Sequence, residues 1–177
     1  MGSDKAAMLV DGEPLWRRQL KTLQGTQPAE LFVSGPLDGP YRDAGVRIVP
    51  DPEPLLGPLS GITAALNECT TNWLLALAVD LPHMRTDYLL RMVRAATQGN
   101  TGIVPVMEGA KLEPLAAVYP RSALPIAAAR HSAKQLKLAD FISDLEARGW
   151  MQRMDVPAED AICFTNWNSP EDVKRPD

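Results

Sequence analysis

The sequence predicts an α/β fold with a mostly parallel sheet, and three observations support this. Short apolar runs typical of strands alternate with stretches of helical periodicity, and the loops between them are short. The run WLLALAVDLP at 73–82 is apolar without alternation, as expected of a strand covered on both faces. The chain has 177 residues, enough to bury the core of one domain spanning 1–177.

The first part of the chain is expected to form a helix and then two strands. Residues 14–24 carry apolar side chains at helical spacing, and Pro14 and Gly25 suit the two ends of that helix. The runs ELFVSG at 30–35 and VRIVPD at 46–51 are typical of short buried strands.

The rest of the chain continues the alternation. The stretch GPLSG opens a helix expected to run to about Thr70, ahead of the strand at 73–82. Thr86 is a candidate cap for the next helix, with Asp87 in its first turn, where a negative charge is favoured. The remaining elements are expected as strands at 102–107 and 114–120, helices at 122–130 and 132–148, and a last strand at 161–168.

The bulk properties exclude several classes of protein. A net charge of -4 gives no general nucleic-acid-binding surface. The sequence contains no apolar run long enough to span a bilayer and no signal-peptide pattern. Cys69 and Cys163 form no disulfide framework and suit buried thiols in a reducing cytoplasm, and with the two histidines they lack zinc-site spacing.

Two predicted strands end in aspartate, where ligands bind in parallel α/β sheets. Asp80 follows the strand at 73–82, where a carboxylate is a natural ligand for a hard cation such as magnesium; it could equally cap the following turn. Asp51 precedes a proline, which is also ordinary turn chemistry.

Other candidate residues carry weaker signals. Gly57 and Gly61 lie at a helix N-terminus, which attracts anions, although such glycines are common in loops. Lys5 follows a glycine turn and can neutralise phosphate charge, or it is simply a solvated lysine. Asn166 and Asn168 share one face of the last predicted strand and can hold a polar ring or a phosphate, or they complete a strand-to-helix turn.

Five segments, taken in order, carry a resemblance to one family. They are MGSDKA, VPDPEPLLGPLSGI, LALAVDLPHM, EPLAAVYPRS and FTNWNSPED, and they cover the chain from Met1 to about Asp172. In this order they resemble the MobA-like nucleotidyltransferases, whose best-known members are the molybdenum cofactor guanylyltransferases. The resemblance implies a Rossmann-like three-layer α/β sandwich and a Mg2+-dependent transfer of GMP from GTP to molybdopterin, or to Mo-molybdopterin, with release of pyrophosphate.

The resemblance also implies roles for individual residues. Lys5 would contact the nucleotide phosphates and Asp80 would hold Mg2+, which makes these two the expected catalytic residues. Asp51 would lie on the nucleoside side, and Gly57 and Gly61 would let the backbone approach the ligand. Magnesium and a lysine offset the repulsion between the reacting phosphates, so no covalent enzyme intermediate is required.

The resemblance assigns a second set of residues to the acceptor. Asn166 and Asn168 would belong to the pterin side, and Lys134 is the nearest match to a basic residue expected at the site. Besides GTP and molybdopterin, the implied partners are proteins of molybdenum cofactor biosynthesis or molybdoenzyme maturation.

The family normally begins with a buried strand and a loop of the form L-A-G-G-x-S-x-R-M-G-x-D-K, whereas this sequence begins at its M-G. We therefore expect that Met1 is an internal methionine, that the natural chain is longer, and that the first strand is missing. The loss of a central strand would expose two inner sheet edges. The alternative is a genuinely short paralogue that binds a partner or a pterin without catalysis.

Rival functions remain open at this point. Within the enzyme class they are cytidylyltransfer to the same cofactor and transfer to another small phosphate acceptor, since base choice depends largely on the absent loop. A sugar-phosphate nucleotidyltransferase fits less well, because the ending NWNSPED suits the molybdenum group better. Outside the enzyme class, the rival is the non-catalytic binding protein.

Overall fold

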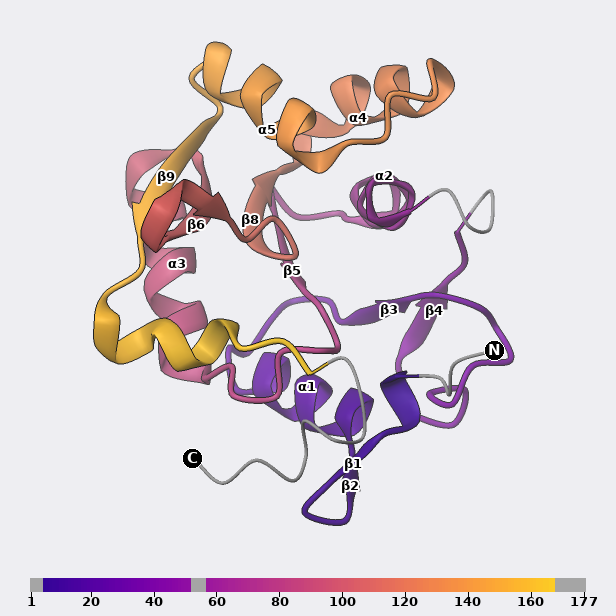
Figure 1. Ribbon diagram of the computed structural model, residues 1–177. Coiled ribbons are helices and arrows are strands. Elements are labelled where there is room, and N and C mark those ends of the chain that lie inside the picture. The colour runs from indigo at the N-terminus through magenta and orange to yellow at the C-terminus, as the bar shows by residue number, and fades with distance from the viewer. Residues whose placement is uncertain (1–4, 52–56, 168–177) are drawn as a thin grey trace.

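The computed structural model describes residues 5–51 and 57–167 and confirms the predicted α/β class (Figure 1). The α-helices are α1 (Leu15–Gln24), α2 (Pro58–Glu68), α3 (Thr86–Gly99), α4 (Leu124–Ser132) and α5 (Leu138–Ala147). The 3-10 helices are η1 (Lys5–Ala7), η2 (Glu108–Ala110), η3 (Arg121–Ala123) and η4 (Ala158–Phe164). The strands are β1 (Leu9–Val10), β2 (Glu13–Pro14), β3 (Phe32–Ser34), β4 (Arg47–Val49), β5 (Trp73–Leu77), β6 (Gly102–Met107), β7 (Lys111–Leu112), β8 (Ala116–Pro120) and β9 (Met151–Asp155).

The largest sheet is mixed, so the prediction of a mostly parallel sheet is wrong for it. Its strand order is β5-β8-β6-β7, with β9 beside β6, and only the β6–β9 pair is parallel. The reason lies in the connection 108–115 between β6 and β8, which contains no crossover helix. A connection of that length returns the chain antiparallel, since parallel neighbours need a crossover of about a dozen residues or more.

Two smaller sheets complete the strand pairing. Strands β3 and β4 form a separate parallel pair, and β1 and β2 form a hairpin that the sequence interpretation missed. The hairpin turns at Asp11 and Gly12, which have φ of 52° and 80°. An Asp-Gly pair with positive φ at both residues is a strong hairpin signal, so the sequence did contain the information.

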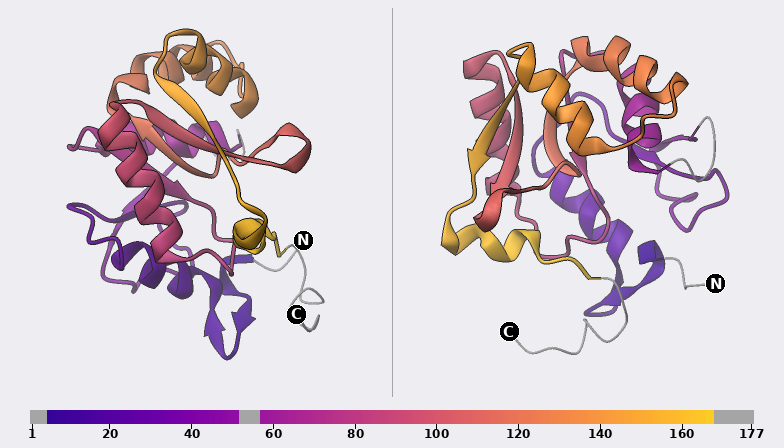
Figure 2. Two further views of the ribbon diagram at one scale, coloured as in Figure 1. Left: turned by 90° about the vertical axis from the view of Figure 1, so that its left-hand side faces the viewer. Right: turned by 45° about the horizontal axis from the view of Figure 1, so that its top comes forward.

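Both faces of the five-stranded sheet are covered, as the apolar strand pattern predicts. Neighbouring residues along β6 and β8 point to opposite faces and enter different apolar clusters. Helices α2, α4 and α5 cover one face, while α3 and η4 cover the other, and Figure 2 shows α3 on the side away from α4 and α5. Within the described residues, no helix combines the length and apolar character needed to cross a membrane.

The end of the chain differs most from expectation. The predicted helix at 132–148 begins only at α5, because Lys134 has φ of 56° and interrupts the helical conformation after α4. The predicted strand at 161–168 is wrong: residues up to Phe164 belong to η4, and the last strand is β9. Cys163 and Phe164 enter the same apolar cluster, which consecutive residues of a strand cannot do, because their side chains point to opposite faces.

Candidate active site

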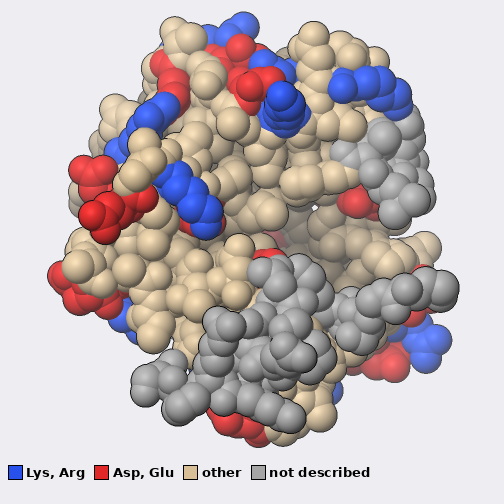
Figure 3. Space-filling view, viewed as in Figure 1, with Lys and Arg blue, Asp and Glu red and all other residues tan. Residues whose placement is uncertain are grey.

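A cavity of about 560 Å³ lies between the β3–β4 sheet and β5, and α1 and α2 supply its other walls. Asp51, Gly57 and Gly61, three of the residues expected at the site, all line it. The space-filling view, drawn from the same side as Figure 1, shows a hollow in the region between α2 and β3 (Figure 3). Residues that follow β4 therefore meet the start of α2 at one cavity.

Asp51 is held by a residue that the sequence interpretation did not select. Ser34 Oγ, at the end of β3, donates a hydrogen bond of 3.1 Å to Asp51 Oδ1. Gly61 lies against both: a Cβ added there would be 2.7 Å from Ser34 Oγ and 3.3 Å from Asp51 Oδ1. A side chain at this position would displace Ser34 Oγ and so disturb the hydrogen bond between Ser34 and Asp51.

The N-terminus of α2 opens onto the same cavity. Gly57 precedes the helix with φ of 84°, a conformation that favours glycine, and Pro58 occupies the first turn. The first turn carries no acidic residue. Its backbone N–H groups and the positive end of the helix dipole make this edge of the cavity favourable for a phosphate or another anion.

Asp80 follows β5 and sits beside the cavity, because its neighbour Val79 is one of the lining residues. The backbone carbonyl of Asp80 accepts a hydrogen bond of 2.9 Å from the N–H of Trp167. Trp167 is buried and packs edge-to-face on His83, with ring centroids 5.3 Å apart. His83 is thus a packing partner of Trp167, and the segment that carries Asn166 reaches Asp80.

Helix α1 fixes the turn that carries Asp80 from the other side. Gln19, which is buried and lines the cavity, donates through Nε2 to the carbonyls of Val79 at 3.5 Å and Leu81 at 2.5 Å. Arg18 Nε donates to the carbonyl of Pro82 at 2.8 Å. The sequence contained one indication of this role: Gln19 is a polar residue on the side of the helix that otherwise carries leucines.

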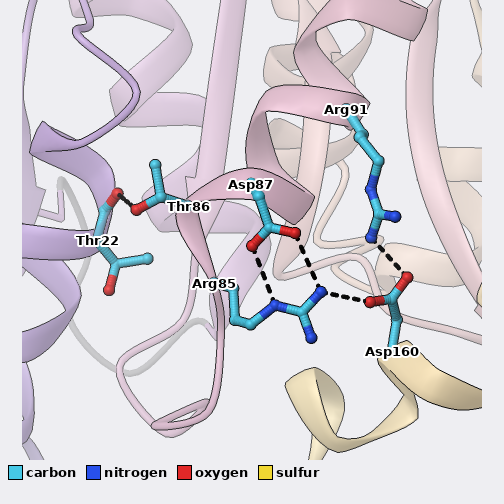
Figure 4. Close-up of polar contacts among 6 residues, drawn as sticks. All are labelled: Thr22, Arg85, Thr86, Asp87, Arg91 and Asp160. Carbon is cyan, nitrogen blue, oxygen red and sulfur yellow. Dashed lines mark hydrogen bonds and ion pairs between the residues drawn. The ribbon is translucent and has the colours of Figure 1, made fainter.

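A charged cluster holds η4 onto the start of α3 (Figure 4). The Asp160 carboxylate, only 1% exposed, accepts hydrogen bonds from Arg85 at 2.6 Å and Arg91 at 2.5 Å. Arg85 also pairs with Asp87, and that hydrogen bond holds the pKa of Asp87 below its usual range. By anchoring η4, the cluster brings the following residues, Trp167 among them, to Asp80.

Thr86 has a different role from the predicted helix cap. No side-chain hydrogen bond caps the start of α3, and Thr86 Oγ1 instead donates to the backbone carbonyl of Thr22 at 2.9 Å (Figure 4). This contact ties α3 to α1. Asp87 does lie in the first turn of α3, as predicted.

The remaining predicted site residues do not all lie at the cavity. Lys5 begins η1, and its neighbour Ala6 lines the cavity, whereas the Lys5 side chain lies outside the described part of the structure. Asn166 is exposed in the segment after η4, and Asn168 lies outside the described residues. Lys134 is exposed in the turn after α4 and is not among the residues that line the cavity.

The donor groups of the site suit a magnesium ion only when a substrate supplies further ligands. Within the part of the chain that the structure describes, no three His, Cys, Asp or Glu side chains cluster closely enough to hold a metal ion. Magnesium is usually bound through one or two carboxylates together with substrate phosphates. The single Asp80 carboxylate therefore fits an ion that arrives with a nucleotide, rather than a cage built by protein alone.

Comparisons with known proteins agree with this arrangement. The family model described as "MobA-like NTP transferase domain" matches residues 1–148. A probable molybdenum cofactor guanylyltransferase of Opitutus terrae is 31% identical, with 99% of this chain and 87% of the relative covered. The molybdenum cofactor guanylyltransferase of Cupriavidus metallidurans is 26% identical, with coverage of 97% and 85%.

Solved structures show the same fold. Molybdopterin-guanine dinucleotide biosynthesis protein A from Archaeoglobus fulgidus superposes with a TM-score of 0.79 at 19% identity and covers 98% of this chain and 88% of its own. The 2-C-methyl-D-erythritol 4-phosphate cytidylyltransferase from Thermus thermophilus gives 0.70 at 18% identity, with coverage of 96% and 90%. Both similarities confirm the Rossmann-like α/β fold.

Proposed function

The chain belongs to the MobA-like NTP transferase family, and on this premise we propose that it is a molybdenum cofactor guanylyltransferase. It transfers GMP from GTP to molybdopterin, or to Mo-molybdopterin, and releases pyrophosphate. The observation that carries the proposal is the meeting of Asp51, the α2 N-terminus and the end of β5 at one cavity. The names of relatives that cover nearly the whole chain support the choice of substrate.

The proposed reaction is a direct transfer between phosphates. An oxygen of the acceptor phosphate attacks the α-phosphorus of GTP, the bond from that phosphorus to the bridging oxygen of the β-phosphate breaks, and pyrophosphate leaves. The α2 N-terminus and Lys5 offset the negative charge of the reacting groups, while Gly57 and Gly61 leave room for the nucleotide next to the backbone.

The other proposed residues orient the two substrates. Asp51, fixed by Ser34, accepts hydrogen bonds from the nucleoside, and Asn166 and Asn168 contact the pterin. Asp80 would hold Mg2+, which would neutralise triphosphate charge and make the α-phosphorus more electrophilic. Lys134, exposed in the turn after α4, is proposed as the basic residue of the site.

We also propose that residues 1–177 form a single domain. The family model ends at residue 148, but β9 lies beyond it and pairs with β6, and η4 packs against α3. These contacts support a role for the last part of the chain in the same folded unit.

The experiment measures transfer of α-labelled GMP from GTP to purified molybdopterin, with and without magnesium. Asp80→Ala should lower the rate by about 100-fold or more, because the Mg2+ ion whose charge would offset the triphosphate loses its protein ligand. Asp43→Ala, an exposed loop change outside the cavity, is the control and should retain the rate.

Two outcomes separate the alternatives. Faster turnover with CTP than with GTP would make the protein a cytidylyltransferase, an activity that its structural relative from Thermus thermophilus bears in its name. Binding of molybdopterin without any transfer, unchanged by Asp80→Ala, would overturn the enzymatic proposal in favour of a binding protein.

A further inference from the structure

Glu113 is a buried acid that the proposed reaction does not use. It is 8% exposed, and among the described residues Asp160 is the only other acidic residue that is buried. Asp160 is held by two arginines, whereas the one ion pair described for Glu113 is with Lys111, whose side chain is 63% exposed. A buried carboxylate with so little compensation is costly, so a ligand that donates hydrogen bonds to it gains affinity there.

The Glu113 carboxylate also has acceptor capacity that the protein leaves unused. Lys111 Nζ lies 2.6 Å from Oε1, but the contact lacks hydrogen-bond geometry, and Oε1 has no hydrogen-bond partner among the described residues. A carboxylate has two oxygens and can accept two parallel hydrogen bonds at once. The side chain therefore suits a ligand that presents two neighbouring N–H groups.

The backbone fixes Glu113 at the end of the sheet where β5 leads to Asp80. The N–H of Glu113 donates to the carbonyl of Pro105 at 3.0 Å, which holds it beside β6. Two residues later, the carbonyl of Leu115 accepts from the N–H of Ala78 at 2.7 Å, just ahead of Asp80. Leu115 lines the nucleotide cavity and Glu113 does not. Glu113 thus lies at the same end of the sheet as Asp80, outside the cavity assigned to the nucleotide.

The Glu113 side chain lies on the face of the sheet that η4 covers. Lys111 pairs with Met107 across the β6–β7 ladder, and Met107 packs against the apolar cluster under α3 and η4. Leu112 packs against the cluster on the other face, so alternation places Lys111 and Glu113 together on the η4 side. Asn166, proposed above for the pterin, lies in the segment that follows η4.

We propose that the Glu113 carboxylate recognises the 2-amino-4-oxopyrimidine edge of the pterin acceptor. That edge carries an amino group next to a ring N–H, so it can donate two parallel hydrogen bonds to one carboxylate. The proposal rests on the proposed function for the identity of the acceptor, and it adds the residue that selects the ring.

Guanine presents the same edge, so the test must separate the two substrates. Glu113→Gln keeps the shape of the side chain but replaces an acceptor oxygen with a donor. It should raise KM for molybdopterin about tenfold or more and leave kcat and KM for GTP unchanged, because the lost contact contributes to binding alone. A rise in KM for GTP instead would mean that Glu113 binds guanine, and the proposal would be wrong.

The matched control is Glu108→Gln. Glu108 is an exposed acid in η2, between β6 and β7, and its loss removes the same charge from the same hairpin. Neither KM should change in this variant. Equal increases in KM for molybdopterin in Glu108→Gln and Glu113→Gln would show a general effect of charge and would contradict a specific contact with Glu113.

Direct binding tests the selectivity for the ring without any transfer. The probes are pterin and lumazine, two fluorescent rings that differ because lumazine has an oxygen in place of the 2-amino group. At neutral pH the wild type should bind pterin about tenfold more tightly, since the lumazine oxygen would face the carboxylate without a proton between them. Glu113→Gln should lose most of this preference, and Glu108→Gln should keep it.

Three results would overturn the proposal: equal binding of pterin and lumazine by the wild type, no binding of pterin at millimolar protein, or a preference that survives in Glu113→Gln. The wild-type comparison needs no variant, so it decides the question even where Glu113→Gln does not fold. The binding experiments also need no GTP. A chain that prefers pterin but transfers nothing would contradict the proposed function alone, and an active transferase without the preference would contradict this inference alone.

Discussion

Asp160 connects two segments of the chain that are far apart in sequence. Its buried carboxylate pairs with Arg85 and Arg91 on and next to α3, while Asp160 itself belongs to η4. The two arginines are about half-exposed, so the cluster is anchored at one buried acceptor. The position of η4, and through it the contact of Trp167 with Asp80, depends on this one carboxylate.

Asp160→Ala should therefore destabilise the protein. We expect a loss of about 2 kcal/mol in the free energy of unfolding, less than for a fully buried pair because both arginines can return to water. Urea unfolding measures it. Asp87→Ala is the control, since that exposed pair is screened by solvent and should matter far less. Equal losses for the two variants would contradict a structural role specific to Asp160.

The candidate site was only partly predictable at the residue scale. Asp51, Gly57 and Gly61 stand in recognisable short motifs, and they do meet at one cavity. Ser34 and Gln19 could not be selected, because their partners lie 17 and 62 residues away in the sequence. A linear pattern contains no information about which distant carbonyl or carboxylate a polar side chain will reach.

At the scale of elements, one ion pair joins the last two helices. Arg130 on α4 donates through Nε to Asp144 on α5 at 2.6 Å, and this hydrogen bond lowers the pKa of Asp144. The folded protein thus binds the Asp144 proton less tightly than the unfolded chain does. The pair contributes stability above the unfolded pKa of about 3.9, and that stability is lost as pH falls through the lower folded value.

The measurable consequence is a weaker acid dependence in Asp144→Asn. Unfolding free energies measured between about pH 5 and pH 2 should fall less steeply in this variant than in the wild type. Asp38→Asn, in an exposed loop, should keep the wild-type slope. An unchanged slope in Asp144→Asn would show that the pair adds no pH-dependent stability.

Elements were predicted best where their pattern is local. The helices α1, α2 and α3 and the strands β3, β4, β5, β6 and β8 lie within a few residues of their expected positions. The relative direction of β6 and β8 was not predictable from the strands themselves. It is set by the connection 108–115, which contains no crossover helix. The segment up to Phe164 was mistaken for a strand because its apolar residues are too few to reveal a period.

At the scale of the whole molecule, the β3–β4 pair is hydrogen-bonded to no other strand within the described residues. A pair of strands alone is marginally stable, whereas β6 and β8 lie inside the larger sheet with Val104 and Val118 fully buried. Local opening should therefore be easier at β3 than at β6.

Native-state hydrogen exchange without added ligand measures this difference. Amides of Val33 and Val49 should exchange at least about tenfold faster than those of Val104 and Val118, because the larger sheet opens only with much of the core. Val33 is compared rather than Ser34, since its N–H is already paired with β4 and reports opening of the pair itself. Similar rates at all four would mean that both sheets open together.

The division of the interior by the sheet has a consequence for how the sequence can change. Ile103 and Val104 are adjacent in the chain, yet one belongs to the cluster under α3 and the other to the cluster under α4 and α5. Side chains on the two faces do not touch, so a change of volume on one face needs compensation only on that face. The two halves of the interior can therefore drift during evolution, or be redesigned, largely independently of each other.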